Sequence, residues 1–130
     1  MPSITPVTVA PIDSLLPECS GLEYAGGGWF WAQNDGRHDN RIYRFDSSGV
    51  VAGILTINNA VNEDWEDLTH DNGKNFLYIG DIGNNLCDRH NLRIYRIVYP
   101  AAGPSTQATA DSICFTYPDQ TVESEPCQVH

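Results

Sequence analysis

The chain of 130 residues lacks any run of about 18 apolar residues, so the sequence predicts no membrane-spanning helix. Basic residues are scarce: 7 Lys and Arg stand against 17 Asp and Glu, giving a formal net charge of -10. This balance argues against nucleic acid and anionic membrane as partners. The N-terminus lacks the basic start and unbroken apolar core of a secretory signal, and the sequence leaves the location of the protein open.

Motifs for zinc binding and for nucleophilic catalysis are also missing. The 4 Cys show no C-x-x-C spacing, which argues against a zinc ribbon or a thiol redox site. Free thiols are favoured over disulfides. No G-x-S-x-G nucleophile elbow is present, and the His residues fall in predicted turns, loops or the tail. The sequence therefore does not predict a self-sufficient serine hydrolase.

Helical periodicity is absent as well, because Gly and Pro interrupt each candidate segment, and this predicts an all-β fold. Short runs rich in β-branched and aromatic residues alternate with turn residues. The strands that we expect span residues 20–24, 29–32, 41–45, 50–57, 66–69, 76–79, 93–96 and 112–117. Residues 4–10 are β-branched and punctuated by Pro, which is typical of an edge strand or an extended arm.

Part of this pattern occurs twice. Residues of one type are separated by 46 positions in three pairs: Leu22 and Leu68, Phe30 and Phe76, and Asp35 and Asp81. The tetrapeptide Arg-Ile-Tyr-Arg occurs at 41–44 and again at 93–96, so the loop carrying residues 86–91 has grown by about six residues. Repeats of about 40 to 50 residues with four short strands are typical of β-propeller blades. A β-sandwich is the alternative.

We therefore expect a partial β-propeller of two four-stranded antiparallel blades. The predicted parts are an N-terminal arm or edge strand at 1–18, one blade at 19–60, a second at 61–119, and the start of a third blade or a tail at 120–130. Two blades alone would expose aromatic residues, among them Trp31, Phe76, Tyr78 and Tyr95. The expected solutions are self-association into a ring or filament, strand exchange through the arm and the tail, or membership of a longer parent chain.

Four oxygen-bearing side chains are the candidate metal ligands: Asp35, Glu66, Asp81 and Asn84. Glu66 lies in a predicted innermost strand, and the other three lie in loops after second strands, which meet at one rim of a propeller. Ca²⁺ prefers such oxygen ligands, although it takes about six to eight of them. In the alternative, Asp81, Gly83 and Asn84 hold their loop in shape through side-chain to backbone hydrogen bonds.

Carboxylates also crowd around Trp65 at positions 63, 64, 66 and 67. Crowded carboxylates raise one another's pKa, which is one route to acid or base chemistry. In the alternative, Trp65 packs between blades while Glu66 or Asp67 accepts hydrogen bonds from backbone N–H groups.

Several segments resemble a bacterial group of β-propellers: Trp31–Gly36, Trp65–Leu68, Leu77–Asn85 and Ile94–Arg96. The last three resemble the group's WEDIA…LYVGDIGDN…IYR signature, and the first resembles its W-x-x-N-D-S-G segment with one residue missing. The resemblance implies a six-bladed propeller of the TolB-like, phytase-like or esterase-like kind, secreted or periplasmic. The chain departs from the group at Asn85, which stands in place of an Asp-Asn pair, at Pro126-Cys127 in place of Ala-Leu, and in having two predicted blades.

These features favour a binding or assembly module that completes its fold by self-association or within a longer parent, without complete catalytic machinery. The alternative is a portion of a Ca²⁺-dependent hydrolase of phytase-like or lactonase/esterase-like character. In that case Glu66, Asp35, Asp81 and Asn84 would hold the Ca²⁺. The sequence names no ligand or substrate.

Overall fold

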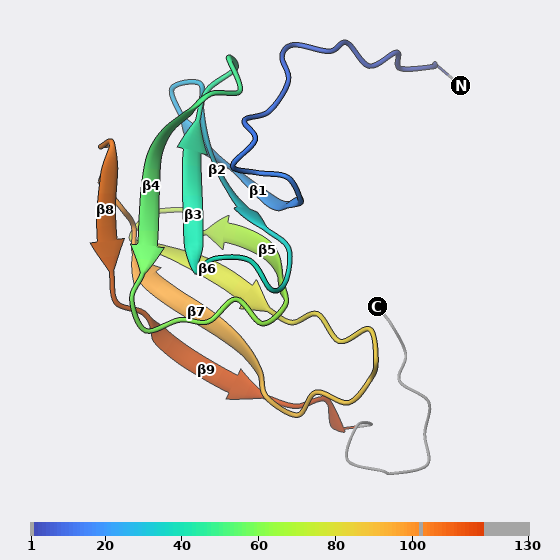
Figure 1. Ribbon diagram of the computed structural model, residues 1–130, viewed down its shortest axis with the longest axis vertical. Helices are drawn as coiled ribbons and strands as arrows, with labels where there is room; N and C mark the ends of the chain where they lie inside the picture. Colours follow the sequence, from blue (N-terminus) through green and yellow to red (C-terminus); the bar gives the residue numbers. More distant parts are fainter. Residues whose placement is uncertain (1, 102, 119–130) are drawn as a thin grey trace.

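The structure is a computed structural model that describes residues 2–101 and 103–118. Within these residues the chain is all-β and forms two sheets (Figure 1). The predicted fold class is thereby confirmed at the level of all-β architecture. The segment 120–130, for which a third blade or a tail is expected, lies outside the described residues.

The first sheet has the strand order β1-β2-β3-β4-β8. Its strands are β1 (Cys19–Gly26), β2 (Trp29–Asn34), β3 (Arg41–Phe45), β4 (Val51–Ile57) and β8 (Ser105–Ala108). Strands β1 to β4 are antiparallel neighbours, whereas β8 is parallel to β4, with Ser105 opposite Ile54. The sequence does not predict β8, because its polar residues form a strand only where the free edge of β4 offers hydrogen bonds.

The second sheet has the strand order β5-β6-β7-β9 and is antiparallel throughout. Its strands are β5 (Trp65–His70), β6 (Phe76–Asp81), β7 (Leu92–Val98) and β9 (Asp111–Phe115). The two Arg-Ile-Tyr-Arg segments lie in the third strand of each sheet. Tyr43 of β3 pairs with Ala32 of β2, and Tyr95 of β7 pairs with Ile79 of β6.

The strand pairings correct two matches made from the sequence, that of Phe30 with Phe76 and that of Asp35 with Asp81. The pairs that set the register are Cys19–Asn34 and Leu22–Ala32 in the first sheet, and Trp65–Asp81 and Leu68–Ile79 in the second. Asp81 of β6 therefore corresponds to Asn34 of β2 and not to Asp35. The β5–β6 hairpin contains one more residue than the β1–β2 hairpin, which moves the positions of β6 by one relative to those of β2.

The two sheets pack against each other around one hydrophobic core. Trp65 is fully buried there, with its ring centroid 6.0 Å from that of Tyr95 and its indole N–H donating to the Val61 carbonyl oxygen at 3.1 Å. Most of the other core residues are aliphatic: Ile42, Leu55, Ile57, Ala60, Leu68, Leu77, Ile79, Ile97 and Ala110. Trp31 and Tyr95 are each 3% exposed, so the expected exposure of these two aromatic residues was wrong.

The outer face of the first sheet is covered by residues 11–17, the cap segment. Leu16 is 1% exposed and packs with Ala32, Tyr43 and Phe45 in a second hydrophobic cluster. Burial of one leucine side chain stabilises this contact by roughly 1.5–3 kcal/mol. The cap segment therefore shields an apolar sheet face that would otherwise be in water.

Hydrogen bonds fix the cap segment to the turn between β3 and β4. The Asp13 N–H donates to the Gly49 carbonyl oxygen at 2.8 Å, and the Val51 N–H donates to Asp13 Oδ2 at 3.0 Å. Gly49 has a φ of 76°, and a Cβ there would collide with the Pro11 carbonyl oxygen. Glycine is thus required at this turn for both reasons.

Residues 2–10 form no strand and extend from the body of the molecule as an arm (Figure 1). Ile4, Val7 and Val9 are 92%, 83% and 76% exposed. No helix in the described part of the chain is long and apolar enough to cross a membrane.

The expectation of free thiols is wrong for Cys87. Cys87 is disulfide-bonded, whereas Cys19 and Cys114 are free and exposed. The spacing of cysteines along the chain carries no signal for this outcome, because a disulfide depends on which loops meet in space.

Candidate functional site

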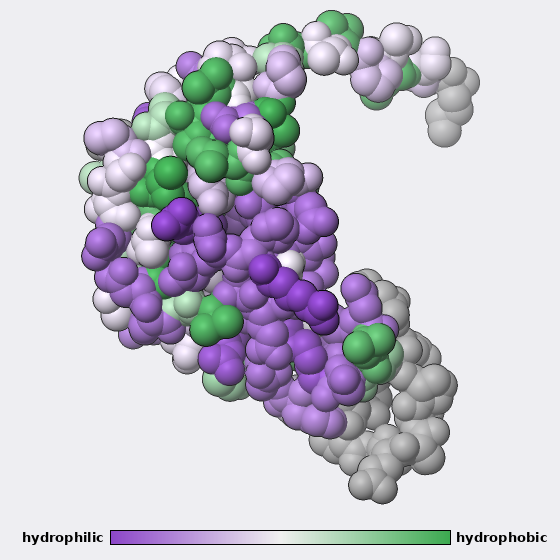
Figure 2. All heavy atoms as spheres, viewed as in Figure 1, coloured by the Kyte–Doolittle hydropathy of each residue, from purple (hydrophilic) through white to green (hydrophobic). Residues whose placement is uncertain are grey.

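A polar cavity of about 380 Å³ lies where the loop after β2, the segment before β5 and the loop after β6 meet. Its lining is mostly charged or amide-bearing: Glu18, Asp35, Arg37, Glu63, Asp64, Asn84, Asn85, Asp88 and Arg89. Figure 2 shows hydrophobic residues gathered over the upper part of the molecule and hydrophilic residues over its middle and lower parts. The cavity is therefore suited to a cation or a polar ligand.

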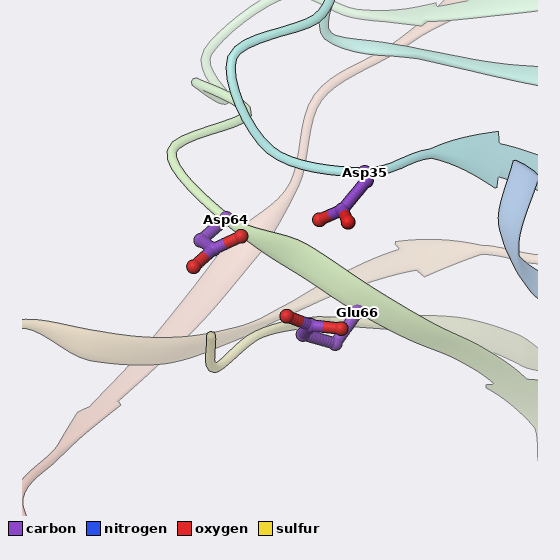
Figure 3. A group of neighbouring side chains, drawn as sticks. All are labelled: Asp35, Asp64 and Glu66. Atoms are coloured by element: carbon purple, nitrogen blue, oxygen red, sulfur yellow. The ribbon is translucent and has the colours of Figure 1, made fainter. Parts of the chain in front are cut away.

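Three carboxylates converge beside this cavity (Figure 3). One oxygen from each of Asp35, Asp64 and Glu66 lies within 4.8 Å of the others. Asp64 directly precedes β5 and Glu66 is its second residue, so the alternation of a strand turns both side chains to one face. Asp35 follows β2 and reaches the same point because the two sheets pack together.

Two glycines leave the space that Asp64 fills. A Cβ at Gly83 would collide with the Asp64 carboxylate, and a Cβ at Gly36 would lie 2.6 Å from Asp64 Oδ1. The backbone of Asp35 is also fixed, because its N–H donates to the Glu18 carbonyl oxygen at 2.8 Å. The cluster thus lies on fixed backbone rather than on a free loop tip.

The carboxylates affect one another's ionisation. Burial raises the pKa of Asp64, and the neighbouring Asp35 carboxyl raises it further. Burial also raises the pKa of Glu66, with added repulsion from Asp35 and Asp64. Burial is the largest cause in both cases, and Asp35, which lies 29 positions before Asp64 in the chain, contributes to both. A bound cation would relieve this repulsion.

Asp81 lies apart from these three carboxylates, in the interior. It is 1% exposed, and its Oδ1 accepts from the Asp64 N–H and from Arg89 Nη1, each at 2.9 Å. Burial raises the pKa of Asp81, and the Arg89 guanidinium opposes that rise. This ion pair joins the end of β6 to the loop of residues 82–91.

Asn84 lines the cavity and also shapes the same loop. Its Oδ1 accepts from the Arg89 N–H at 3.0 Å, and its carbonyl oxygen accepts from the Cys87 N–H at 3.0 Å. Arg89 Nη1 also donates to the Gly83 carbonyl oxygen at 2.8 Å. These contacts match the alternative in which Asp81 and Asn84 hold the loop.

The structure therefore brings together two of the four predicted ligands, Asp35 and Glu66, and adds Asp64. The sequence carried a signal for Asp64, since residues two apart on a strand share a face and Glu66 was already a candidate. No local pattern indicated the role of Arg89.

His70 connects the two sheets at the opposite end of β5. Its Nδ1 lies 2.8 Å from the Asp71 carbonyl oxygen, its Nε2 lies 3.2 Å from the Tyr24 carbonyl oxygen, and Glu23 Oε1 is 3.8 Å away. Both ring nitrogens thus face acceptors, which is a structural arrangement, and His70 lies at the other end of β5 from the cluster of Asp35, Asp64 and Glu66.

No family model, no curated protein and no solved structure matches this chain. The chemistry of the site is therefore argued from its geometry alone.

Proposed function

We propose that this protein is a β-propeller-type binding or assembly module, with two blades in this chain and no complete catalytic centre. In this proposal its fold is completed by self-association or by further blades of a longer parent. Four antiparallel strands in each sheet, β1-β2-β3-β4 and β5-β6-β7-β9, support it, because four-stranded antiparallel sheets are the units of propellers. Strand β8, which lies between β7 and β9 in the chain, adds a parallel fifth strand to the first sheet.

The observation that carries the proposal is which face of each sheet lies in the core between the two sheets. Strand pairing makes Tyr95 of the second sheet the counterpart of Tyr43 in the first. Tyr95 lies in the core between the sheets, whereas Tyr43 lies on the outer face beneath the cap segment. Corresponding faces therefore point the same way, as in blades around an axis. A two-fold sandwich of duplicated sheets would bring corresponding faces together.

A repeated cation–π pair supports the same reading. The Arg44 guanidinium lies 3.7 Å from the ring centroid of Trp29, and that of Arg96 lies 4.6 Å from the ring centroid of Phe76. Arg44 and Arg96 each end an Arg-Ile-Tyr-Arg segment, so the contact recurs at corresponding places in the two sheets.

Hydrolase assays on the purified chain test this proposal. We expect no turnover of p-nitrophenyl esters or of phytate, with or without Ca²⁺, because the described residues offer carboxylates but no activated nucleophile. Turnover by a monodisperse monomer, lost in Asp64→Asn and Glu66→Gln, would contradict the proposal.

The second candidate function is Ca²⁺ binding, as part of a Ca²⁺-dependent hydrolase or as a structural site. The three converging carboxylates favour it, because repulsion among Asp35, Asp64 and Glu66 is removed by a divalent cation. Further oxygens would have to come from water or neighbouring carbonyl groups, since Ca²⁺ takes about six to eight.

Thermal melting during a Ca²⁺ titration tests this candidate. Ligand at one hundred times its dissociation constant stabilises the folded state by about 2.7 kcal/mol, which raises the melting temperature by several degrees. Asp64→Asn and Glu66→Gln should abolish the rise, whereas Asp39→Asn removes an exposed charge outside the cluster and should retain it. Absence of any rise in the wild type, or loss of the rise in Asp39→Asn, rules out a site at these carboxylates.

A further inference from the structure

The outward face of the second sheet, here the open face, carries apolar side chains that nothing in the described structure covers. Its central residues, fixed by the pairings of β6, β7 and β9, are Phe76, Tyr78, Ile94, Arg96, Val98 and Ile113. Val98 is 73% exposed and Ile113 is 58% exposed. The face is thus both apolar and accessible to a partner.

Three of these positions, Tyr78, Ile94 and Ile113, have counterparts in the first sheet that lie buried against the second sheet. Ile94 pairs with Ile113 as Ile42 pairs with Leu55, and Ile42 and Leu55 are 0% and 1% exposed in the core. Tyr78 pairs with Arg96 as Trp31 pairs with Arg44. The open face therefore repeats a surface that is already known to accept a sheet.

The side chains that cover that surface in the first sheet also have counterparts. The second sheet contributes Leu77, Ile79 and Tyr95 to the core. By strand pairing, the corresponding residues of the first sheet are Phe30, Ala32 and Tyr43, which form its outer face beneath Leu16. The same molecule thus carries a surface that is complementary to its open face, on the outer side of the first sheet.

We propose that the open face binds the outer face of the first sheet in a second copy of this chain, head to tail, and that the cap segment is displaced when it does. This inference rests on the proposed function, since it uses the correspondence of the two sheets. The interface is heterologous, and such an interface builds a ring if the rotation closes and a filament if it does not.

The cap segment is attached in a way that permits its release. One buried side chain, Leu16, and a few hydrogen bonds at Asp13 and Leu15 fix it, and no strand pairing ties it to the sheet. The arm of residues 2–10 that precedes it is exposed and adds no anchor. A partner sheet would cover the outer face of the first sheet with several apolar side chains, where the cap segment covers it with Leu16 alone.

Charge opposes association between copies. The chain has a net charge of -10, so two copies repel, and added salt screens that repulsion. Self-association through the open face should therefore strengthen as the salt concentration rises, in contrast to an interface held by ion pairs.

Light scattering coupled to size-exclusion chromatography tests the proposal on the full chain. We expect the mass of the wild type to rise with concentration and with salt. Ile113→Glu should remain monomeric at least tenfold above the concentration at which the wild type associates, because it places a charge in the open face. Leu16→Asp should associate at a concentration at least tenfold lower, because it releases the cap segment. The double variant should be monomeric.

Leu86→Glu is the matched control, since Leu86 is also an exposed apolar residue but lies at the polar cavity. It should associate as the wild type does. Circular dichroism verifies folding, and Ile113→Ser is the milder substitute if Ile113→Glu unfolds.

Monomers of both wild type and Leu16→Asp at all concentrations overturn the proposal. So does a dimer that Ile113→Glu disrupts but Leu16→Asp leaves unchanged, because two open faces would then meet each other. A monomer without hydrolase turnover overturns this inference alone, whereas turnover by the monomer overturns the proposed function.

Discussion

The Ser20 hydroxyl donates a 2.9 Å hydrogen bond to the Glu66 carbonyl oxygen, and 46 positions separate these two residues. The same separation relates Tyr24 to His70, whose Nε2 lies 3.2 Å from the Tyr24 carbonyl oxygen. The first strands of the two sheets, β1 and β5, thus run side by side in step. Contacts near both ends of these strands fix how one sheet lies on the other, and the position of the carboxylate cluster depends on that alignment.

Replacement of Trp65 tests the core between the sheets. Trp65→Ala removes a fully buried ring and should lower the free energy of unfolding by about 3–5 kcal/mol, as measured by urea denaturation. Trp29→Ala is the control, because Trp29 is only partly buried and packs against Arg44, and its loss should be smaller. If Trp65→Ala does not fold, Trp65→Phe should still show a loss. Equal losses at Trp65 and Trp29 would contradict the assigned core.

Gln33 is the least satisfied polar side chain in the described core. It is 0% exposed, it lies against Gly21, and neither its Nε2 nor its Oε1 has a hydrogen-bond partner among the described residues. Gln33→Met preserves the shape of the side chain and removes the two unpaired polar atoms, so we expect the free energy of unfolding to rise by about 1–3 kcal/mol. Gln107→Met, at an exposed position of β8, should change stability little. A loss of stability in Gln33→Met would mean that the amide has a partner.

The all-β class could be predicted from the sequence because apolar and β-branched runs between turn residues fix strands locally. Strand β8 could not, since Ser105–Ala108 has no apolar pattern of its own and depends on the free edge of β4. The carboxylate cluster was predictable in part. Glu66 and Asp64 share a face by alternation, but the approach of Asp35 depends on how two sheets pack, which no local pattern encodes.

The buried pair of Asp81 and Arg89 gives a prediction about the loop of residues 82–91. Arg89→Met leaves a buried carboxylate without its partner, and such a loss costs about 3–5 kcal/mol. Burial raises the pKa of Asp81 and Arg89 opposes the rise, so the pKa should rise further in the variant. The loss measured by chemical denaturation should therefore be smaller at acidic pH, where Asp81 takes up a proton. Adding Asp81→Asn to the variant should recover part of the stability, and no recovery would contradict the pairing.

Asp13 gives the cap segment a dependence on pH. Hydrogen bonds from the Val51 and Leu15 N–H groups lower the pKa of Asp13 in the folded state. The unfolded chain therefore takes up a proton first as pH falls, so Asp13 stabilises the fold at neutral pH and this contribution is lost in acid. Asp13→Asn should melt at a lower temperature than the wild type at pH 7, and the difference should narrow as pH falls below about 4.

Amide hydrogen exchange at Val51 should be faster in Asp13→Asn, since the Val51 N–H loses the carboxylate acceptor. The control Asp39→Asn, at an exposed position outside the cap segment, should leave Val51 exchange unchanged. A melting difference that stays constant from pH 7 to pH 3 would show that Asp13 does not hold the cap segment through its charge.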